Sequence, residues 1–118
     1  MPFHSFYLFP DNTSVTSTTS PVYSNPIDQA MCYQTQGILS VQWSRTGGDC
    51  TIDVLGCNDP AAFTNPGASG LVWSTISTIT VNANSGFTTI AQPAARIVRF
   101  KITRGTADTV ITVKACWP

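Results

Sequence analysis

The chain has 118 residues, which is enough for one buried core, so a second domain is excluded. Only 10% of the residues are charged, and six Lys and Arg balance six acidic residues, so the chain has no basic field to hold nucleic acid. Serine and threonine number 28, and Thr, Val and Ile favour strands over helices. The composition therefore predicts an all-β protein that does not bind nucleic acid.

No stretch approaches the roughly 18 to 20 apolar residues of a membrane span, so no membrane contact is expected. Residues 1–10 lack the basic region and apolar run of a signal peptide, which predicts synthesis in a cytoplasm. Four cysteines in that setting are expected to be free thiols that pack as small apolar residues. A Cys32–Cys116 pair stays open if the N-terminal segment lies along the last strand.

Residues 1–37 are predicted to form an extended N-terminal arm, separate from a body of residues 38–118. This segment contains four prolines, no Lys or Arg, and a long polar run at 11–20. Large apolar side chains near its start are predicted to bind a partner, and removal of residues 1–20 is predicted to leave a folded body that attaches weakly. The alternative is that these side chains cover the sandwich of their own subunit. The side chains are Phe3, Phe6, Tyr7, Leu8 and Phe9.

From residue 38 onward, short apolar alternations are separated by turn residues, which is typical of an antiparallel sandwich. In 38–44 the alternation places Leu39, Val41 and Trp43 on one face. A Gly-Gly turn at 46–49 predicts a hairpin to the next strand, at 50–57. A loop with two prolines and two glycines follows at 58–70.

Four further strands are predicted after this loop, at 71–81, 87–90, 97–103 and 109–117. The last two alternate most clearly, and their inward residues are predicted to form the centre of the core: Phe100, Ile102, Ile111 and Val113. No segment keeps a 3.6-residue apolar period, so no helix longer than about two turns is expected. The prediction is an all-β, jelly-roll-like antiparallel β-sandwich with an extended N-terminal arm.

The sequence offers little for catalysis, because His4 is the single histidine and glutamate is absent. We therefore expect no enzyme activity and no cofactor. Cys50 and Cys57 would face opposite sides of one strand, so they do not form a zinc motif. A calcium site is the alternative to turn-forming aspartates, which are more common, and no metal is predicted. The aspartates concerned are Asp49, Asp53 and Asp59.

Three tryptophans raise the question of a sugar-stacking platform. Trp43 and Trp117 fall in register with inward apolar positions, so they are expected in the core. Trp73 lies on a mixed face and is a possible ligand-facing residue.

The order of motifs in residues 38–117 resembles small tailed-phage virion proteins of the capsid decoration, or cement, type. The resemblance follows the 40–43 strand, the Gly-Gly turn, G-x-N-D at 56–59, the Trp73 strand, the Gly86 turn, and R-x-V-R-x-x-x-T-R at 96–104. Discoidin-like and carbohydrate-binding sandwiches have a comparable penultimate strand. The long aromatic arm and the four cysteines depart from the pattern and leave a tail or fibre component open.

The resemblance implies a protein on the outer capsid surface that binds the major capsid protein and stabilises the shell, usually as a trimer at symmetry axes. The near-zero net charge and the arm likewise favour a homo-oligomer. The competing hypothesis is a glycan- or receptor-binding module of a tail or fibre, in which Trp73 and the 58–70 loop face the ligand. Loss of binding on removal of the arm would favour the decoration protein.

Overall fold

The structure is a computed structural model that describes residues 4–6, 9–29, 38–91 and 95–117, with side chains for 9–29, 38–91 and 95–116. Four short strands precede residue 38, and six longer strands and one four-residue helix follow it. These elements are β1 (His4–Phe6), β2 (Thr13–Val15), β3 (Val22–Tyr23), β4 (Ile27–Asp28), β5 (Ile38–Gly47), β6 (Cys50–Cys57), α1 (Ala61–Thr64), β7 (Ser74–Val81), β8 (Ser85–Ala91), β9 (Ile97–Arg104) and β10 (Thr109–Trp117).

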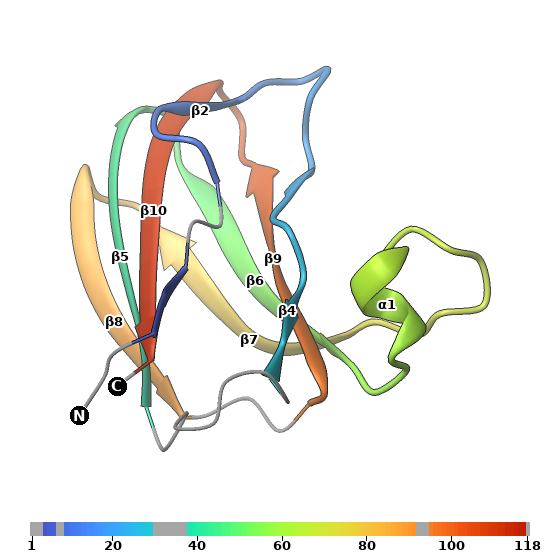
Figure 1. The fold of residues 1–118 in the computed structure, drawn as a ribbon. Coiled ribbons are helices and arrows are strands. Elements are labelled where there is room, and N and C mark those ends of the chain that lie inside the picture. Colours follow the sequence, from blue (N-terminus) through green and yellow to red (C-terminus); the bar gives the residue numbers. More distant parts are fainter. Residues whose placement is uncertain (1–3, 7–8, 30–37, 92–94, 118) are drawn as a thin grey trace.

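The strands form two antiparallel sheets of five strands each, packed face to face (Figure 1). The first sheet has the order β1-β10-β5-β8, with β2 also paired to β10. The second has the order β3-β9-β6-β7, with β4 also paired to β9. The predicted all-β sandwich is confirmed, and α1 is shorter than the two-turn limit expected from the sequence.

The connectivity is that of a jelly roll. If β1 and β2 are counted as one broken strand and β3 and β4 as another, each sheet has four strand positions. Of the connections between strands β5 to β10, only β6 to β7 stays within one sheet, and the others cross between the sheets. This arrangement of two interleaved sheets is the double Greek key of jelly rolls.

The predicted hairpin at residues 46–49 is wrong, because β5 belongs to the first sheet and β6 to the second. The glycines lie instead in a connection that crosses from the first sheet to the second. Gly47 has a φ of +102°, and a Cβ at this position would lie 2.5 Å from the Asp108 carbonyl oxygen, so a larger residue would not fit. A second crossover, between β9 and β10, lies alongside, since the Gly48 amide donates to the Asp108 carbonyl and the Gly105 amide to the Asp49 carbonyl. Turn residues indicate that the chain reverses direction, but they do not specify which sheet the next strand joins.

The core lies between the sheets and contains the inward residues that alternation predicted. Leu39, Val41 and Trp43 on β5 are buried, as are the four residues placed at the centre of the core. Arg45 continues the inward series of β5 and is itself buried at the end of the sandwich. Its guanidinium donates to the Ala83 carbonyl at 2.9 Å, to the Gly47 carbonyl, and to Asp49 at 2.9 Å. The buried charge is therefore paired and hydrogen-bonded at the end of the core that lies next to the crossovers.

The segment predicted as a separate arm supplies strands to both sheets over its described residues. Strand β2 pairs with β10, whereas β3 and β4 pair with β9. Phe9, Val15 and Ile27 are part of the core. The described part of residues 1–37 is therefore built into the sandwich, and we now expect removal of residues 1–20 to destabilise the body. Strands of two or three residues are too short to show alternation, so no strand was predicted in this segment.

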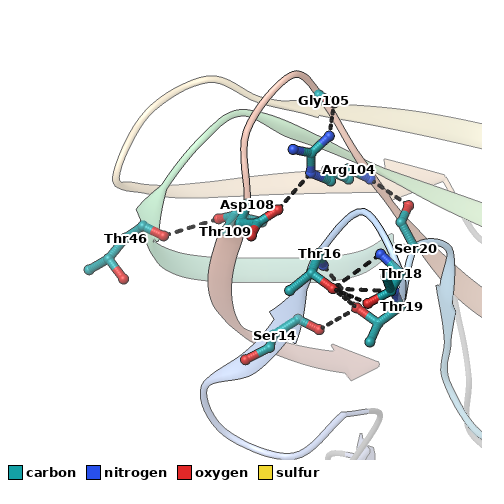
Figure 2. Close-up of polar contacts among 10 residues, drawn as sticks. All are labelled: Ser14, Thr16, Thr18, Thr19, Ser20, Thr46, Arg104, Gly105, Asp108 and Thr109. Carbon is teal, nitrogen blue, oxygen red and sulfur yellow. Dashed lines mark hydrogen bonds and ion pairs between the residues drawn. The ribbon is translucent and has the colours of Figure 1, made fainter.

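Side-chain hydroxyls complete the hydrogen bonding of these short strands. Ser24, between β3 and β4, donates its amide to the Phe100 carbonyl at 2.9 Å, and its Oγ accepts from the Phe100 amide at 2.8 Å. The Ser20 Oγ accepts from the Arg104 amide at 3.0 Å (Figure 2). Hydroxyls thus replace backbone partners where the chain departs from a regular ladder.

The connection from β2 to β3 is held by a threonine cluster, which Figure 2 shows beside the 104–109 crossover. The Thr16 amide donates to Thr19 Oγ1 at 2.8 Å, and the Thr19 amide donates back to Thr16 Oγ1 at 3.2 Å. Thr18 Oγ1 lies 3.1 Å from Thr16 Oγ1. The polar run predicted as part of an extended arm therefore contains a hydrogen-bonded turn at 16–20.

We predict that Phe100→Ala lowers the free energy of unfolding by about 3 to 5 kcal/mol, because it removes a fully buried ring and leaves a cavity. The matched control is Phe87→Ala, since Phe87 is 63% exposed and its loss should cost much less. Urea unfolding of both variants measures the difference. Equal costs would contradict the facing of β9.

Val15→Ala should lower the free energy of unfolding by about 1.5 to 3 kcal/mol, because Val15, which belongs to the N-terminal segment, is fully buried in the core. Val72→Ala is the control, since that side chain is 75% exposed. If Val15→Ala unfolded at the wild-type urea concentration, residues 9–29 would be an arm after all.

Candidate binding site

Arg99 lies on the outward face of β9, the face opposite its buried neighbours Val98 and Phe100. Its guanidinium carbon is 4.2 Å from the ring centroid of Tyr23 and 4.3 Å from that of Trp73. Both distances are within the range of a cation–π interaction. One aromatic ring comes from the N-terminal segment and the other from the end of the 58–73 loop, so the fold brings three distant parts of the sequence together at this cation.

The charge around Arg99 sets it apart from the other arginines. Arg45, Arg96 and Arg104 each bind an aspartate at 2.8 to 2.9 Å. Among the described residues, Arg99 has no carboxylate within ion-pair distance, and its Nε is enclosed without a hydrogen-bond acceptor. The cation is therefore stabilised by ring faces, and no carboxylate of the described residues neutralises it.

The electrostatics of the site are consistent with this geometry. Desolvation by burial lowers the pKa of Arg99, and the neighbouring Tyr23 acts in the opposite direction. A guanidinium stays protonated in proteins, so the side chain remains a cation with a planar fork of donors. Because the rings restrict its movement, little side-chain entropy is left to lose when an acceptor binds.

Trp73, the possible ligand-facing residue, is partly buried and has two structural contacts besides Arg99. Its indole N–H donates to the Pro66 carbonyl at 3.0 Å, which ties the loop to β7. Its ring packs against the small cluster of Cys57, Ala62 and Ile97. Trp73 thus supports the Arg99 guanidinium and is not a bare platform for stacking a sugar.

Exposed apolar side chains gather on the elements around this cluster. Four large hydrophobic residues remain exposed on these elements: Tyr23 on β3, Phe63 in α1, Val72 in the loop before β7, and Ile76 on β7. In Figure 1, α1 and this loop project to one side of the sandwich. A pocket of about 220 Å³ is lined there by Gly56, Cys57, Asn58, Val72, Ser74, Ile76 and Ala95. We call Tyr23, Arg99 and Trp73 the Arg99 surface.

The arm residues predicted to bind a partner have different positions. Phe9 is only 2% exposed and lies in the core of its own chain, so its assignment as a partner-binding residue is wrong. Phe6 lies in β1, whose backbone pairs with β10, and its side chain is outside the described set. Phe3, Tyr7 and Leu8 lie outside the described residues.

The predicted thiols and carboxylates are distributed over separate sites. Cys50 and Cys57 are buried in different clusters, Cys116 is half-buried, and all three are free, while Cys32 lies outside the described residues. The three aspartates considered for calcium each have another contact: Asp49 binds Arg45, Asp53 accepts from Thr78, and Asp59 accepts from the Ala61 amide. Within the described ranges, no three His, Cys, Asp or Glu side chains are grouped as metal ligands.

Comparisons with known proteins return no relative: no protein-family model matches the chain, and no curated protein matches it. In the part of the chain that the structure describes, no helix has the length and apolar character needed to cross a membrane.

The thiols give a direct test of the packing. Burial raises the pKa of Cys50, although Arg45 partly opposes the shift, so this thiol should form little thiolate at pH 8. In the native protein, Cys50 and Cys57 should resist iodoacetamide, whereas the half-buried Cys116 should react before both of them. Mass-spectrometric peptide mapping measures the order, and urea-unfolded protein is the control. Early labelling of Cys50 would contradict its position in the core.

Proposed function

We propose that the protein is a structural virion protein, a capsid decoration or cement protein that binds the major capsid protein on the outer capsid surface. In this role it bridges neighbouring coat subunits as a homo-oligomer and stabilises the shell without catalysis. The proposal begins from the resemblance of residues 38–117 to phage decoration proteins. A jelly roll by itself does not decide between roles, since capsid proteins and lectins share it.

The Arg99 surface carries the proposal. Tyr, Trp and Arg are the residue types most enriched where protein interfaces hold most of their binding energy. Here they form one cluster, in which the Arg99 guanidinium has no carboxylate of the described chain within ion-pair distance. We expect a carboxylate of a coat subunit to accept from Arg99, because carboxylates match the planar donor fork of arginine.

The rest of the surface suits a protein that is packed into an assembly. The chain has zero formal net charge and many hydroxyl side chains, so like-charge repulsion between neighbouring copies is weak. The N-terminal side chains outside the described set, Phe3, Phe6, Tyr7 and Leu8, remain candidates for a second contact with the coat.

The proposal is tested by sedimenting capsids that lack this protein with the purified chain. Arg99→Ala should weaken co-sedimentation by about thirtyfold or more, the equivalent of about 2 kcal/mol for a residue at an interface centre. Arg99→Lys keeps the charge but loses the planar fork, so it should restore only part of the binding. Arg104→Ala, at the end of the same strand, is the matched control and should bind as the wild type does.

If the Arg99→Ala variant binds capsids with the same affinity as the wild type, another surface attaches the protein to the capsid. Wild-type protein that ignores capsids but binds an immobilised glycan, with loss of binding in Trp73→Ala, would instead support the glycan- or receptor-binding module.

A further inference from the structure

Over the described residues, one side of the sandwich is open and is formed by the edge strands β7 and β8. Strand β8 is the edge of the first sheet and β7 the edge of the second, and Figure 1 shows β8 as the outermost strand there. A groove of about 750 Å³ lies between them. Its lining residues include Trp43, Ile79, Phe87 and Ile90, and none of the residues that line it is charged.

Strand β8 lacks the devices that normally protect an exposed edge. Its sequence, SGFTTIA, contains no charge and no proline, and its register with β5 runs without a bulge from Ser85 to Ala91. Every residue of β8 is exposed or half-buried, and Phe87 is 63% exposed. Long, regular and uncharged edges of this kind are templates for pairing with another strand.

The other edges are better protected. Strand β7 has a bulge opposite Val54 and Leu55, and the Asp53 carboxylate of β6 binds its Thr78 hydroxyl. On the far side of the sandwich, the sheets end in β1, β2, β3 and β4, which have only two or three residues each. Edge strands this short offer little backbone to a partner. β8 is therefore the edge best able to pair.

The packing beneath β8 leaves one polar group of the described residues without a partner. Gly86 allows the Trp43 indole to approach, since a Cβ at this position would lie 2.1 Å from Trp43 Cζ2. The indole Nε1 is buried and, among the described residues, has no hydrogen-bond acceptor. A buried donor without an acceptor is costly, and its residue, Trp43, lines the groove beside the outer edge of β8.

We propose that β8 pairs antiparallel with β8 of a second copy of this chain around a two-fold axis. The second copy is the occupant favoured by the charges, because an uncharged edge on a molecule of zero net charge neither repels its own copy nor selects a charged partner. A two-fold axis places the same strand on both sides, so the first sheets of the two copies join into one continuous sheet.

The proposed contact limits the assembly to two copies, and its interface is small. Once β8 is paired in both copies, only the short edge strands on the far side remain, and these offer little backbone to a further copy. Pairing at β8 therefore gives a dimer and not a fibre. Seven paired residues cover about 23 Å of strand, which corresponds to a small interface with concentration-dependent association. This dimer replaces the trimer that the resemblance implied as the basic unit, and it does not depend on capsid binding.

Sedimentation equilibrium of the purified protein across a wide concentration range tests the proposal. Wild type should pass reversibly from monomer to dimer. Thr89→Lys places a charge on the exposed face of the edge and should weaken the dimer at least tenfold. Gln42→Lys places the same charge on an exposed position of the adjacent interior strand and is the matched control, with dimerisation kept.

Amide hydrogen exchange of the wild type covers the case in which Thr89→Lys fails to fold. Amides of β8 should gain protection as the protein concentration rises, and amides of β7 should not. A monomer at all concentrations, a trimer, an unweakened Thr89→Lys dimer, or concentration-dependent protection confined to β7 would each overturn the proposal. Because no capsid is present, these results are independent of the co-sedimentation test of the proposed function.

Discussion

The structure depends on the hydrogen bonding of β9 and β10, the two strands that lie inside their sheets beside the N-terminal segment. Each has a long neighbour on one side, β6 for β9 and β5 for β10, and only the segment on the other. Without it, backbone donors and acceptors next to the core would lack partners, which is costly. This constraint explains why a polar, proline-containing segment still folds: it satisfies the backbone of two core strands and buries Phe9, Val15 and Ile27 as it does so.

The same constraint gives a physical role to the many serines and threonines. Proline and short strand length prevent the segment from forming a regular ladder, so hydroxyls such as those of Ser20 and Ser24 accept from the amides of β9. Thr112 on β10 likewise accepts from the Asn12 amide at 2.9 Å. A hydroxyl-rich composition therefore serves the fold as well as the surface, and it keeps charges away from the edges where copies would meet.

Sequence alternation predicted the facing of β5, β9 and β10, because a two-residue period directly records which side chains meet the core. It did not predict which sheet each strand joins, since Gly47 and Gly48 serve a crossover as readily as a hairpin. Nor did it place Tyr23 and Trp73 on Arg99. The motif at 96–104 shows that Arg99 faces outward, but the two rings approach it only through the pairing of β3 with β9 and the return of the 58–73 loop. Contacts between side chains that are far apart in the sequence depend on the strand topology, so no local sequence pattern predicts them.

The two proposed contact regions belong to different sheets, and this separation has a consequence for assembly. The Arg99 surface lies on the outer face of the second sheet, whereas β8 is the edge of the first. A copy bound through Arg99 therefore keeps its β8 edge free for another copy. Pairing of two bound copies would couple two individually modest contacts, so that release of one leaves it held at high effective concentration near its site. A small protein with one uncharged edge and one aromatic–arginine cluster can in this way hold neighbouring subunits firmly without any single interface being large.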